Sequence, residues 1–295
     1  MTLTREGQWA LIVHGGAKQM QPGEEQANRS GVLRAAEEGR KILAEGGTAL
    51  DAVESAIRVM EDLPVFNAGR GSALNEAGEI EMCAGLMDGR DISVGAVAAI
   101  RGVRNPISVA RRLLPEKEIL LAGEGAARFA REQGLEAASD AELKGERPLE
   151  AAHDTVGAVA RDSGGNIAAG TSTGGLTGAR VGRVGDSPLP GAGLYADNHV
   201  GGVSISGDGE SIARLALASQ VMGSIAELGP ERAIRKALER LPHVGGAEGD
   251  GGGIAIAKDG RIGWAHNSPA FAVAHASGDS PEPKAFLSKD EERRG

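Results

Sequence analysis

The sequence of 295 residues predicts an α+β fold in which helices lie outside and sheets lie inside. Candidate strands cluster and candidate helices cluster in each half of the chain, instead of alternating one by one. Glycine is abundant, at 46 residues, whereas aromatic residues make up only 2% of the chain. The core must therefore be packed from Ala, Val, Leu and Ile, with glycines that let neighbouring backbones approach closely.

The first half is predicted to begin with a buried strand over residues 9–14, which the pair Gly15-Gly16 ends. Thr48 lies three residues before Asp51, a spacing typical of a helix start. The segment Asp88-Gly89-Arg90-Asp91 is typical of a hairpin turn. Together with apolar spacing, these signals predict a helix over 27–45, a helix over 48–62, strands over 79–87 and 92–101, and helices near 106–114 and 122–133.

The second half is predicted to contain two hairpins and two helices: strands over 156–161 and 166–171, helices over 210–224 and 230–240, and strands over 252–258 and 261–266. Residues 134–154 are charged and weakly periodic, which favours a flexible linker, with a short exposed helix as the alternative. Residues 277–295 are rich in proline and charge, and we expect a disordered tail there.

Composition excludes several classes of partner. The formal charge is −9, and no cluster of Lys and Arg alternates with aromatic residues, which argues against nucleic acid and against an anionic membrane. The start of the chain is polar and no apolar stretch reaches 18 residues, so we expect a cytoplasmic protein. Cys83 is the only cysteine and is interpreted as a buried structural thiol. No His, Cys or Asp cluster has transition-metal spacing, and we expect no organic cofactor, so a small polar molecule is the favoured ligand.

The segment His153-Asp154-Thr155 lies at the head of an apolar run of small residues. A threonine within a chain becomes an activated nucleophile if the peptide bond before it is cut, because the freed α-amine then lies beside its own hydroxyl. The pKa of such an amine is about 7.7–8.0, so a useful fraction is unprotonated near neutral pH. The alternative is that Thr155 is an ordinary strand residue.

Further segments resemble the plant-type asparaginase family of N-terminal nucleophile hydrolases, which includes isoaspartyl peptidase/L-asparaginases and glycosylasparaginases. The similarity covers about residues 8–270 and rests on these segments: Ile12–Ala17, Phe66–Gly69, Gly170–Thr177, Gly182–Asp197 and Ser204–Glu210. It implies a four-layer αββα sandwich in a single domain, 1–295. It also implies self-cleavage between Asp154 and Thr155 into an α subunit, 1–154, and a β subunit, 155–295, with a homodimer of cleaved αβ protomers as the working unit.

The resemblance assigns catalytic roles to four residues. Thr155 matches the nucleophile, and Thr173 matches a second threonine that hydrogen-bonds the nucleophile's hydroxyl. The Ser206 hydroxyl and the Gly207 N–H match the donors to the oxyanion. The commonest isoaspartyl pattern has threonine where Ser206 and Asp208 stand here, so the resemblance leaves the substrate preference in doubt.

The resemblance also implies a site for a free aspartyl group. Arg183 and Asp186 match residues that bind its α-carboxylate and α-ammonium, and an Arg fork beside a carboxylate suits those two charges. The alternative is an exposed salt bridge between the two side chains. The Gly209 carbonyl matches a second contact to the ammonium, and Asn67 matches a residue near the active site.

A structural sodium ion is also implied by the family, with backbone carbonyls as its ligands. The matching carbonyls are those of Met60, Glu61, Leu63, Phe66, Ala68 and Arg70.

The sequence thus favours a self-cleaving amidohydrolase that acts on β-aspartyl dipeptides and L-asparagine. The first alternative is a glycosylasparaginase, which cleaves the amide between asparagine and a sugar. The second is an uncut binding protein that senses aspartate through Arg183 and Asp186.

Overall fold

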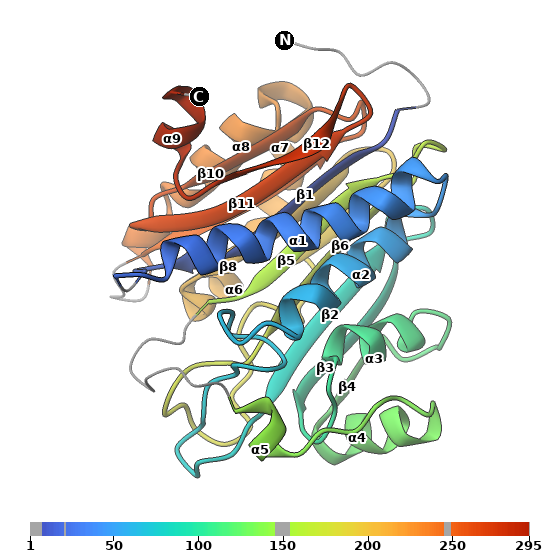
Figure 1. Cartoon of the computed structure of the whole chain (residues 1–295), viewed down its shortest axis with the longest axis vertical. Coiled ribbons are helices and arrows are strands. Elements are labelled where there is room, and N and C mark those ends of the chain that lie inside the picture. The colour runs from blue at the N-terminus through green and yellow to red at the C-terminus, as the bar shows by residue number, and fades with distance from the viewer. Residues whose placement is uncertain (1–7, 21, 145–153, 245–248, 295) are drawn as a thin grey trace.

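The computed structural model describes residues 8–20, 22–144, 154–244 and 249–294. These residues form two β-sheets packed face to face between two layers of helices (Figure 1). In the described part of the chain the larger sheet has eight strands, in the spatial order β12 (Ser280–Phe286), β11 (Ala270–Ser277), β1 (Ala10–Lys18), β5 (Val156–Arg161), β6 (Ile167–Thr173), β2 (Met82–Asp88), β3 (Ser93–Ile100) and β4 (Leu120–Ala122). The smaller sheet has the order β10 (Ile262–His266), β9 (Gly251–Ala257), β8 (Gly201–Gly207) and β7 (Leu194–Asp197).

Helices cover the outer face of each sheet. The larger sheet is covered by α1 (Glu25–Ala44), α2 (Ala49–Glu61), α3 (Pro106–Leu113) and α4 (Gly123–Glu132). The smaller sheet is covered by α7 (Leu217–Leu228) and α8 (Pro230–Leu238). Shorter helices are α5 (Asp140–Leu143), α6 (Gly209–Leu215), a 3-10 turn at Leu241–His243 and α9 (Lys289–Arg294). This arrangement confirms the α+β class and the four-layer αββα sandwich.

Strand β1 shows why the layers pack this way. Leu11 and Val13 lie in the core between the larger sheet and its helices, whereas Ala10 and Ile12 lie in the core between the two sheets. Successive side chains of a strand point to opposite faces, so a strand covered on both faces reads as a continuous apolar run. The inner core that results combines alanines with larger apolar side chains, among them Ile12, Trp264 and Phe271.

The sequence predicted that the first strand ends at Gly15-Gly16, but the strand continues beyond this pair. Its pairing with β11 shifts register between His14 and Ala17, and the strand then continues to Lys18. Gly16 has φ +100°, a conformation that glycine adopts without strain. The two glycines therefore form a bulge within β1 instead of a stop, and the bulge keeps Lys18 in the sheet.

The predicted helices and hairpins are otherwise largely confirmed. Thr48 caps α2 by accepting a hydrogen bond from the Asp51 N–H, as its spacing predicted. The helix expected over 210–224 is instead two helices, α6 and α7. Ala216 breaks them apart with a left-handed backbone, at φ +48° and ψ +55°. Apolar spacing continues across this break, so the pattern alone predicted one helix.

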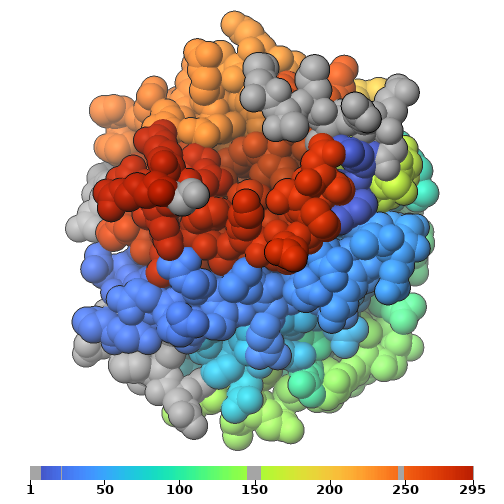
Figure 2. Space-filling model, turned by 45° about the horizontal axis from the view of Figure 1, so that its top comes forward, coloured from blue at the N-terminus to red at the C-terminus, as the bar shows by residue number. Residues whose placement is uncertain are grey.

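The tail is ordered over residues 277–294, which corrects the sequence prediction for these residues. Residues 280–286 form β12 against β11, and α9 follows. In Figure 2 these C-terminal segments, in red, lie directly along α1, in blue. Arg29 joins the two through a 2.8 Å hydrogen bond to the Ala285 carbonyl and a 2.7 Å ion pair with Glu291. The composition suggested disorder, but backbone pairing with β11 orders the segment despite its two prolines.

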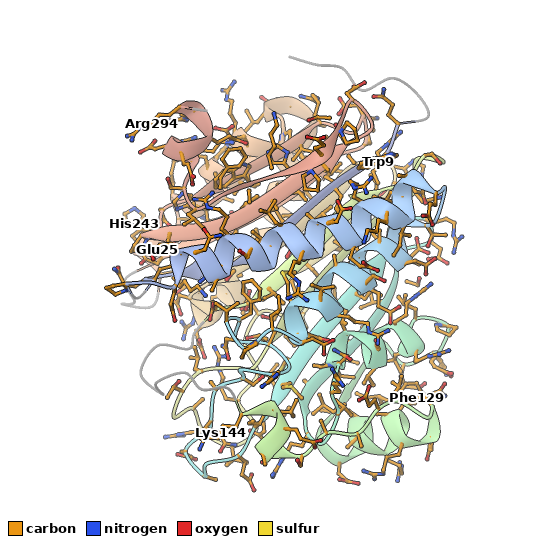
Figure 3. The ribbon with its side chains drawn as sticks, viewed as in Figure 1. Trp9, Glu25, Phe129, Lys144, His243 and Arg294 are labelled. Atoms are coloured by element: carbon orange, nitrogen blue, oxygen red, sulfur yellow. The ribbon has the colours of Figure 1, made fainter. Side chains whose placement is uncertain are left out.

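The predicted linker over 134–154 is described only in part. Residues 140–143 form α5, and Ser139 and Glu142 make a capping box at its start. For this part the alternative of a short exposed helix is confirmed. Lys144, labelled in Figure 3, follows α5 directly, and residues 145–153 lie outside the described residues.

Candidate active site

The Asp154–Thr155 bond lies buried at the start of β5, in the centre of the larger sheet. Asp154 is 1% exposed and Thr155 is 6% exposed. Strand β5 pairs with β1 and β6 on its two sides, and its inner face packs on β8 of the smaller sheet. Groups from both sheets can therefore reach this one peptide bond.

Two side chains donate hydrogen bonds to the Asp154 carbonyl oxygen. Asn67 Nδ2 lies 3.0 Å from it and Thr173 Oγ1 lies 3.3 Å from it. Asn67 is itself held, because its Oδ1 accepts from the Ala73 N–H and its Nδ2 also donates to the Gly175 carbonyl. Fixed donors aimed at a carbonyl oxygen stabilise the negative charge that develops there when the carbon is attacked. The bond before Thr155 is thus polarised for attack.

The groups of Thr155 itself contact two serines. Its N–H donates to Ser206 Oγ at 3.3 Å, and its Oγ1 lies 3.0 Å from Ser187 Oγ. Ser206 Oγ also accepts from the Ala17 N–H at 3.1 Å. Ser206, at the end of β8, therefore ties the smaller sheet to both β1 and the candidate nucleophile.

The Thr155 hydroxyl contacts Ser187 in the uncut chain, not Thr173. The family resemblance placed the Thr173 hydroxyl against the nucleophile's hydroxyl, whereas here it donates to the Asp154 carbonyl. The contact to the Thr155 hydroxyl comes from Ser187. The family resemblance gave Ser187 no role. The signal was its place directly after Asp186, inside the segment that carries the resemblance.

Arg183, Asp186 and Gly209 converge on one place in the structure. A Cβ built on Gly209 would lie 2.9 Å from Arg183 Nη2 and 2.9 Å from Asp186 Oδ1. Only glycine leaves room for the backbone between these two charged groups. Arg183 makes its ion pair with Glu210, through contacts of 2.9 Å and 2.7 Å, so the simple Arg183–Asp186 salt bridge is not what the geometry shows.

Asp186 has the properties of a receptor for a positive group. It is 3% exposed, and its Oδ2 has no hydrogen-bond partner among the described residues. Burial raises the pKa of Asp186 to about 7, against the opposing effect of its own backbone and of Arg183. A buried carboxylate with an unused acceptor would gain most from a bound ammonium group.

Burial keeps both His14 and Cys83 uncharged near neutral pH. His14 Nε2 is 2.8 Å from Ser204 Oγ, and burial lowers the pKa of His14 to about 3. The imidazole is therefore uncharged near neutral pH and serves the contact between the sheets. Burial raises the pKa of the Cys83 thiol to about 11, which agrees with a structural thiol.

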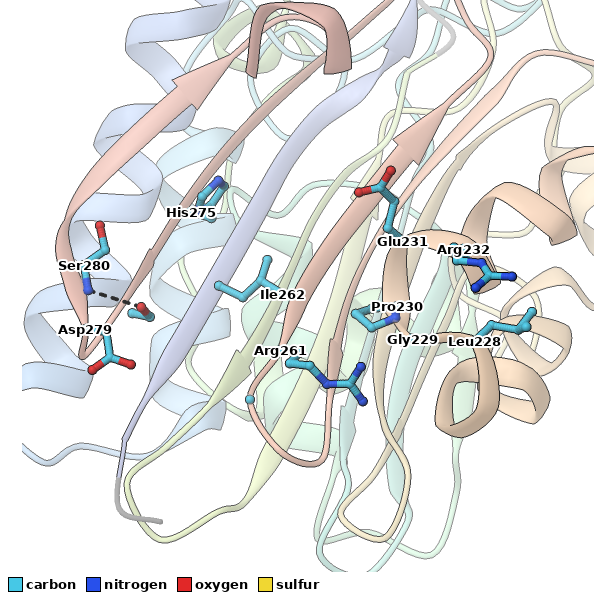
Figure 4. A pocket seen from close by; sticks show the side chains of 12 residues that line it. Leu228, Gly229, Pro230, Glu231, Arg232, Arg261, Ile262, His275, Asp279 and Ser280 are labelled. Atoms are coloured by element: carbon cyan, nitrogen blue, oxygen red, sulfur yellow. Dashed lines mark hydrogen bonds between the residues drawn. The ribbon is translucent and has the colours of Figure 1, made fainter. Parts of the chain in front are cut away.

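One small hollow lies beside Arg183. Arg183 lines a hollow of about 10 Å³, together with Gly174 and Gly175. Such a volume holds roughly one water molecule. A larger hollow, about 750 Å³, is lined by parts of α8, β10 and β12 and shares no lining residue with the Thr155 site (Figure 4). Within that larger hollow, Glu231 and Arg261 already make ion pairs with neighbouring side chains.

Neither a membrane span nor a side-chain metal cluster is found in the described part of the chain. No helix there is long and apolar enough to cross a membrane. No group of three or more His, Cys, Asp or Glu side chains there is placed to hold a metal ion.

Comparison with known proteins gives one consistent family. A family model described as asparaginase matches residues 7–148 and 138–283. The chain is 44% identical over 260 residues to an isoaspartyl peptidase/L-asparaginase of Mus musculus, covering 80% of each chain. It is 43% identical over 258 residues to one of Xenopus laevis, covering 81% of this chain and 84% of that one. It is 40% identical over 290 residues to one of Bos taurus, covering 90% of this chain and 92% of that one. With the αββα sandwich and the polarised bond before Thr155, these matches show that the chain belongs to the plant-type asparaginase family.

Proposed function

We propose that this chain is a self-cleaving threonine amidohydrolase that releases L-aspartate from β-aspartyl dipeptides and from L-asparagine. The observation that carries the proposal is the convergence of Asn67 and Thr173 on the Asp154 carbonyl, directly beside the Thr155 hydroxyl. The relatives named above are isoaspartyl peptidase/L-asparaginases, which supports the same activity.

Self-cleavage begins with attack of Thr155 Oγ1 on the Asp154 carbonyl carbon. The C–O bond forms, the C–N bond breaks, and the hydroxyl proton passes to the leaving amine. Asn67 and Thr173 hold the oxygen that becomes negative during this step. Water then hydrolyses the ester, which leaves a carboxylate on Asp154 and a free α-amine on Thr155.

Turnover reuses the same hydroxyl, with the freed amine of Thr155 as its base. The amide carbon of the substrate is attacked, the amine leaves, and water releases aspartate from the ester. We propose that the Ser206 hydroxyl and the Gly207 N–H stabilise the oxyanion. Arg183 would bind the α-carboxylate of the substrate, and Asp186 with the Gly209 carbonyl would bind its α-ammonium.

The test of cleavage is a denaturing gel with N-terminal sequencing. Wild-type protein should give two fragments, 1–154 and 155–295, and the smaller should begin with threonine. Thr155→Ala should remain one chain, because it has no hydroxyl to attack. A smaller fragment with any other first residue would contradict the mechanism.

The substrate class is tested by parallel kinetics on L-asparagine, a β-aspartyl dipeptide and a glycosylated asparagine. We expect turnover of the first two and little of the third. Preferred turnover of the glycosylated substrate would instead favour the glycosylasparaginase alternative. A cleaved protein that turns over none of the three would contradict the proposed activity.

We propose that the loop after α2 holds a sodium ion through backbone carbonyls. The carbonyls concerned are those of Met60, Glu61, Leu63, Phe66, Ala68 and Arg70. The Arg70 N–H donates to the Glu61 carbonyl at 2.7 Å, which brings the two ends of the loop together. Neutral carbonyl oxygens are ligands that hard cations accept. The melting temperature should be higher in sodium chloride than in choline chloride at equal ionic strength, and equal values would contradict the site.

We also propose a homodimer of cleaved protomers and a cytoplasmic location. Sedimentation of the cleaved protein tests the first, with a single species at twice the protomer mass as the expected result. Fractionation of cells that produce the protein tests the second.

A further inference from the structure

Lys18 forms a buried ion pair with the residue whose carbonyl is to be cut. Its Nζ lies 2.5 Å from Asp154 Oδ2, and the two side chains are 4% and 0% exposed. Lys18 is the last residue of β1, and the bulge at Gly15-Gly16 is what keeps it within this strand. The ammonium also lies 5.7 Å from the centre of the Phe66 ring. Two charges are thus withdrawn from water directly beside the Asp154–Thr155 bond.

Asp154 is held at three points by different parts of the chain. Its carbonyl oxygen accepts from Asn67 and Thr173. Its Cβ lies against Gly16, where an added Cβ would come within 2.3 Å of it. Its carboxylate is held by Lys18. The ion pair completes a clamp that leaves the scissile carbonyl little freedom to turn away from its donors.

The charge of Lys18 also bears on the chemistry of the bond. An unpaired carboxylate at Asp154 would oppose the negative charge that develops on the carbonyl oxygen of the same residue. Such opposition is strong in a buried site, because little water screens it. The Lys18 ammonium balances that carboxylate, so only the charge of the developing oxyanion remains for Asn67 and Thr173 to stabilise.

We propose that Lys18 is a positioning residue for self-cleavage, which acts by fixing and neutralising the Asp154 carboxylate. This inference rests on the proposed self-cleavage at Thr155. Lys18 does not touch the reacting atoms in this account. Its contribution is orientation, and misplacement of a reacting group by about 1 Å costs a reaction roughly 10²-fold.

The experiment follows the conversion of precursor to fragments with time, by denaturing gel and intact mass. Lys18→Met removes the charge and should slow cleavage at least about tenfold, by the orientation argument. Lys18→Arg keeps the charge and should cleave faster than Lys18→Met. The matched control is Arg90→Met, which removes the ion pair with Asp88 at the far end of β2 and should cleave at the wild-type rate.

A double variant tests whether Lys18 acts through Asp154. Asp154→Asn alone should slow cleavage, because it also breaks the ion pair. Lys18→Met combined with Asp154→Asn should cleave no more slowly than Lys18→Met alone, since no unpaired charge remains. Independent effects that multiply would overturn the proposal, as would wild-type cleavage in Lys18→Met or in Asp154→Asn.

Folding is separated from cleavage by repeating each substitution in the Thr155→Ala background, where every chain stays uncut. Melting temperatures there show whether a variant folds. If Lys18→Met does not fold, the cleavage rate of Asp154→Asn, which keeps the volume of the side chain, tests the role of the ion pair instead. An uncut wild type would overturn the proposed self-cleavage, whereas equal rates in wild type and folded Lys18 variants would overturn only the role of Lys18.

Discussion

Asp186 is a buried carboxyl for which we propose a charged ligand, the ammonium group of the substrate. Burial raises its pKa to about 7 from the ordinary value of 3.8. Between these two values the folded chain holds a proton that the unfolded chain has lost. Folding stability therefore falls as the pH rises through this window, because the folded state must then ionise a buried carboxyl. The site keeps a group that costs stability at neutral pH.

We expect Asp186→Asn to raise the melting temperature at pH 8 and to change it much less at pH 4. Thermal denaturation in the uncut Thr155→Ala background measures this effect. Asp91 is the control, since hydrogen bonds from Ser93 lower its pKa, and Asp91→Asn should give no gain at pH 8. In the cleavable protein Asp186→Asn should abolish turnover, because the substrate's ammonium loses its counter-charge. A variant that gained stability and kept full activity would show that Asp186 does not bind substrate.

Ser206 is the residue on which the proposed oxyanion contact depends. Loss of one such donor typically lowers turnover about 10²–10³-fold. We expect Ser206→Ala to lower kcat by that order and to leave KM nearly unchanged, because the contact strengthens only as charge develops. Ser206→Thr keeps the hydroxyl and should retain activity, which separates donor loss from repacking. Steady-state kinetics on a β-aspartyl dipeptide checks both, and wild-type kcat in Ser206→Ala would contradict the assignment.

At the scale of elements, the break between α6 and α7 concentrates strain in one residue. Ala216 has φ +48° and ψ +55°. The left-handed conformation costs a residue with a Cβ about 1–2 kcal/mol, and it costs glycine almost nothing. Glycine also makes the unfolded chain more flexible, which lowers the free energy of unfolding by about 0.4–1 kcal/mol.

We therefore expect Ala216→Gly to raise the free energy of unfolding by about 0.5–1 kcal/mol, the difference between these effects. Urea denaturation of the uncut protein measures it. Ala226 lies within α7 and is exposed, so Ala226→Gly should instead destabilise by about 0.5–1 kcal/mol. Equal destabilisation by both substitutions would mean that Ala216 carries no strain.

The C-terminal helix α9 is joined to the sandwich through the side chain of Glu292. Glu292 of α9 accepts from Trp264 Nε1 at 3.0 Å and contacts His275 Nε2 at 3.1 Å. Burial acts to raise the pKa of Glu292, but hydrogen bonds from His275, Lys289 and Trp264 lower it to about 2. Its contribution to stability is therefore present above about pH 4.5 and is lost as the pH falls toward 2.

Removal of residues 279–295 should lower the melting temperature and promote association, because it uncovers the edge of β11. A disordered tail would have been removed without effect. Glu292→Gln should lower the melting temperature at pH 7 and much less at pH 2.5. Thermal denaturation and size-exclusion chromatography check these outcomes, and an unchanged truncated protein would contradict the role of β12 and α9.

For the whole molecule, we propose that the uncut chain blocks its own substrate site. Self-cleavage passes through an ester of Asp154 on the Thr155 hydroxyl, so Asp154 takes the place that the aspartyl group of a substrate needs. The hollow beside Arg183 is only about 10 Å³ in this state. We propose that room for a ligand comes with cleavage.

L-aspartate should therefore raise the melting temperature of the cleaved protein and leave that of uncut Thr155→Ala unchanged, because a ligand stabilises only the state that binds it. Samples of wild type taken during cleavage are the internal control. The ligand-induced shift should grow with the fraction cut. An equal shift in the uncut protein would mean that the site is open before cleavage.

The amino-acid sequence predicted most elements, because apolar spacing and turn residues are local signals. It placed Thr48 as a helix cap and the hairpin of β5 and β6 correctly. Its predictions were wrong where contacts with segments distant in the sequence override the local pattern. The Gly15-Gly16 pair forms a bulge because β11 pairs on both sides of it, and the tail is ordered because β11 and α1 bind it.

The sequence by itself determined which reactive side chains are available: a threonine after an acidic residue, and an Arg and an Asp that match the two charges of an aspartyl group, among small residues. Only the tertiary structure decided which atoms meet. Thr173 donates to the Asp154 carbonyl, Ser187 meets the Thr155 hydroxyl, and Lys18 binds a carboxylate 136 positions away in the chain. These contacts join strands that are distant in sequence, and their geometry follows from sheet register and from the packing of one sheet on the other, which no local pattern records.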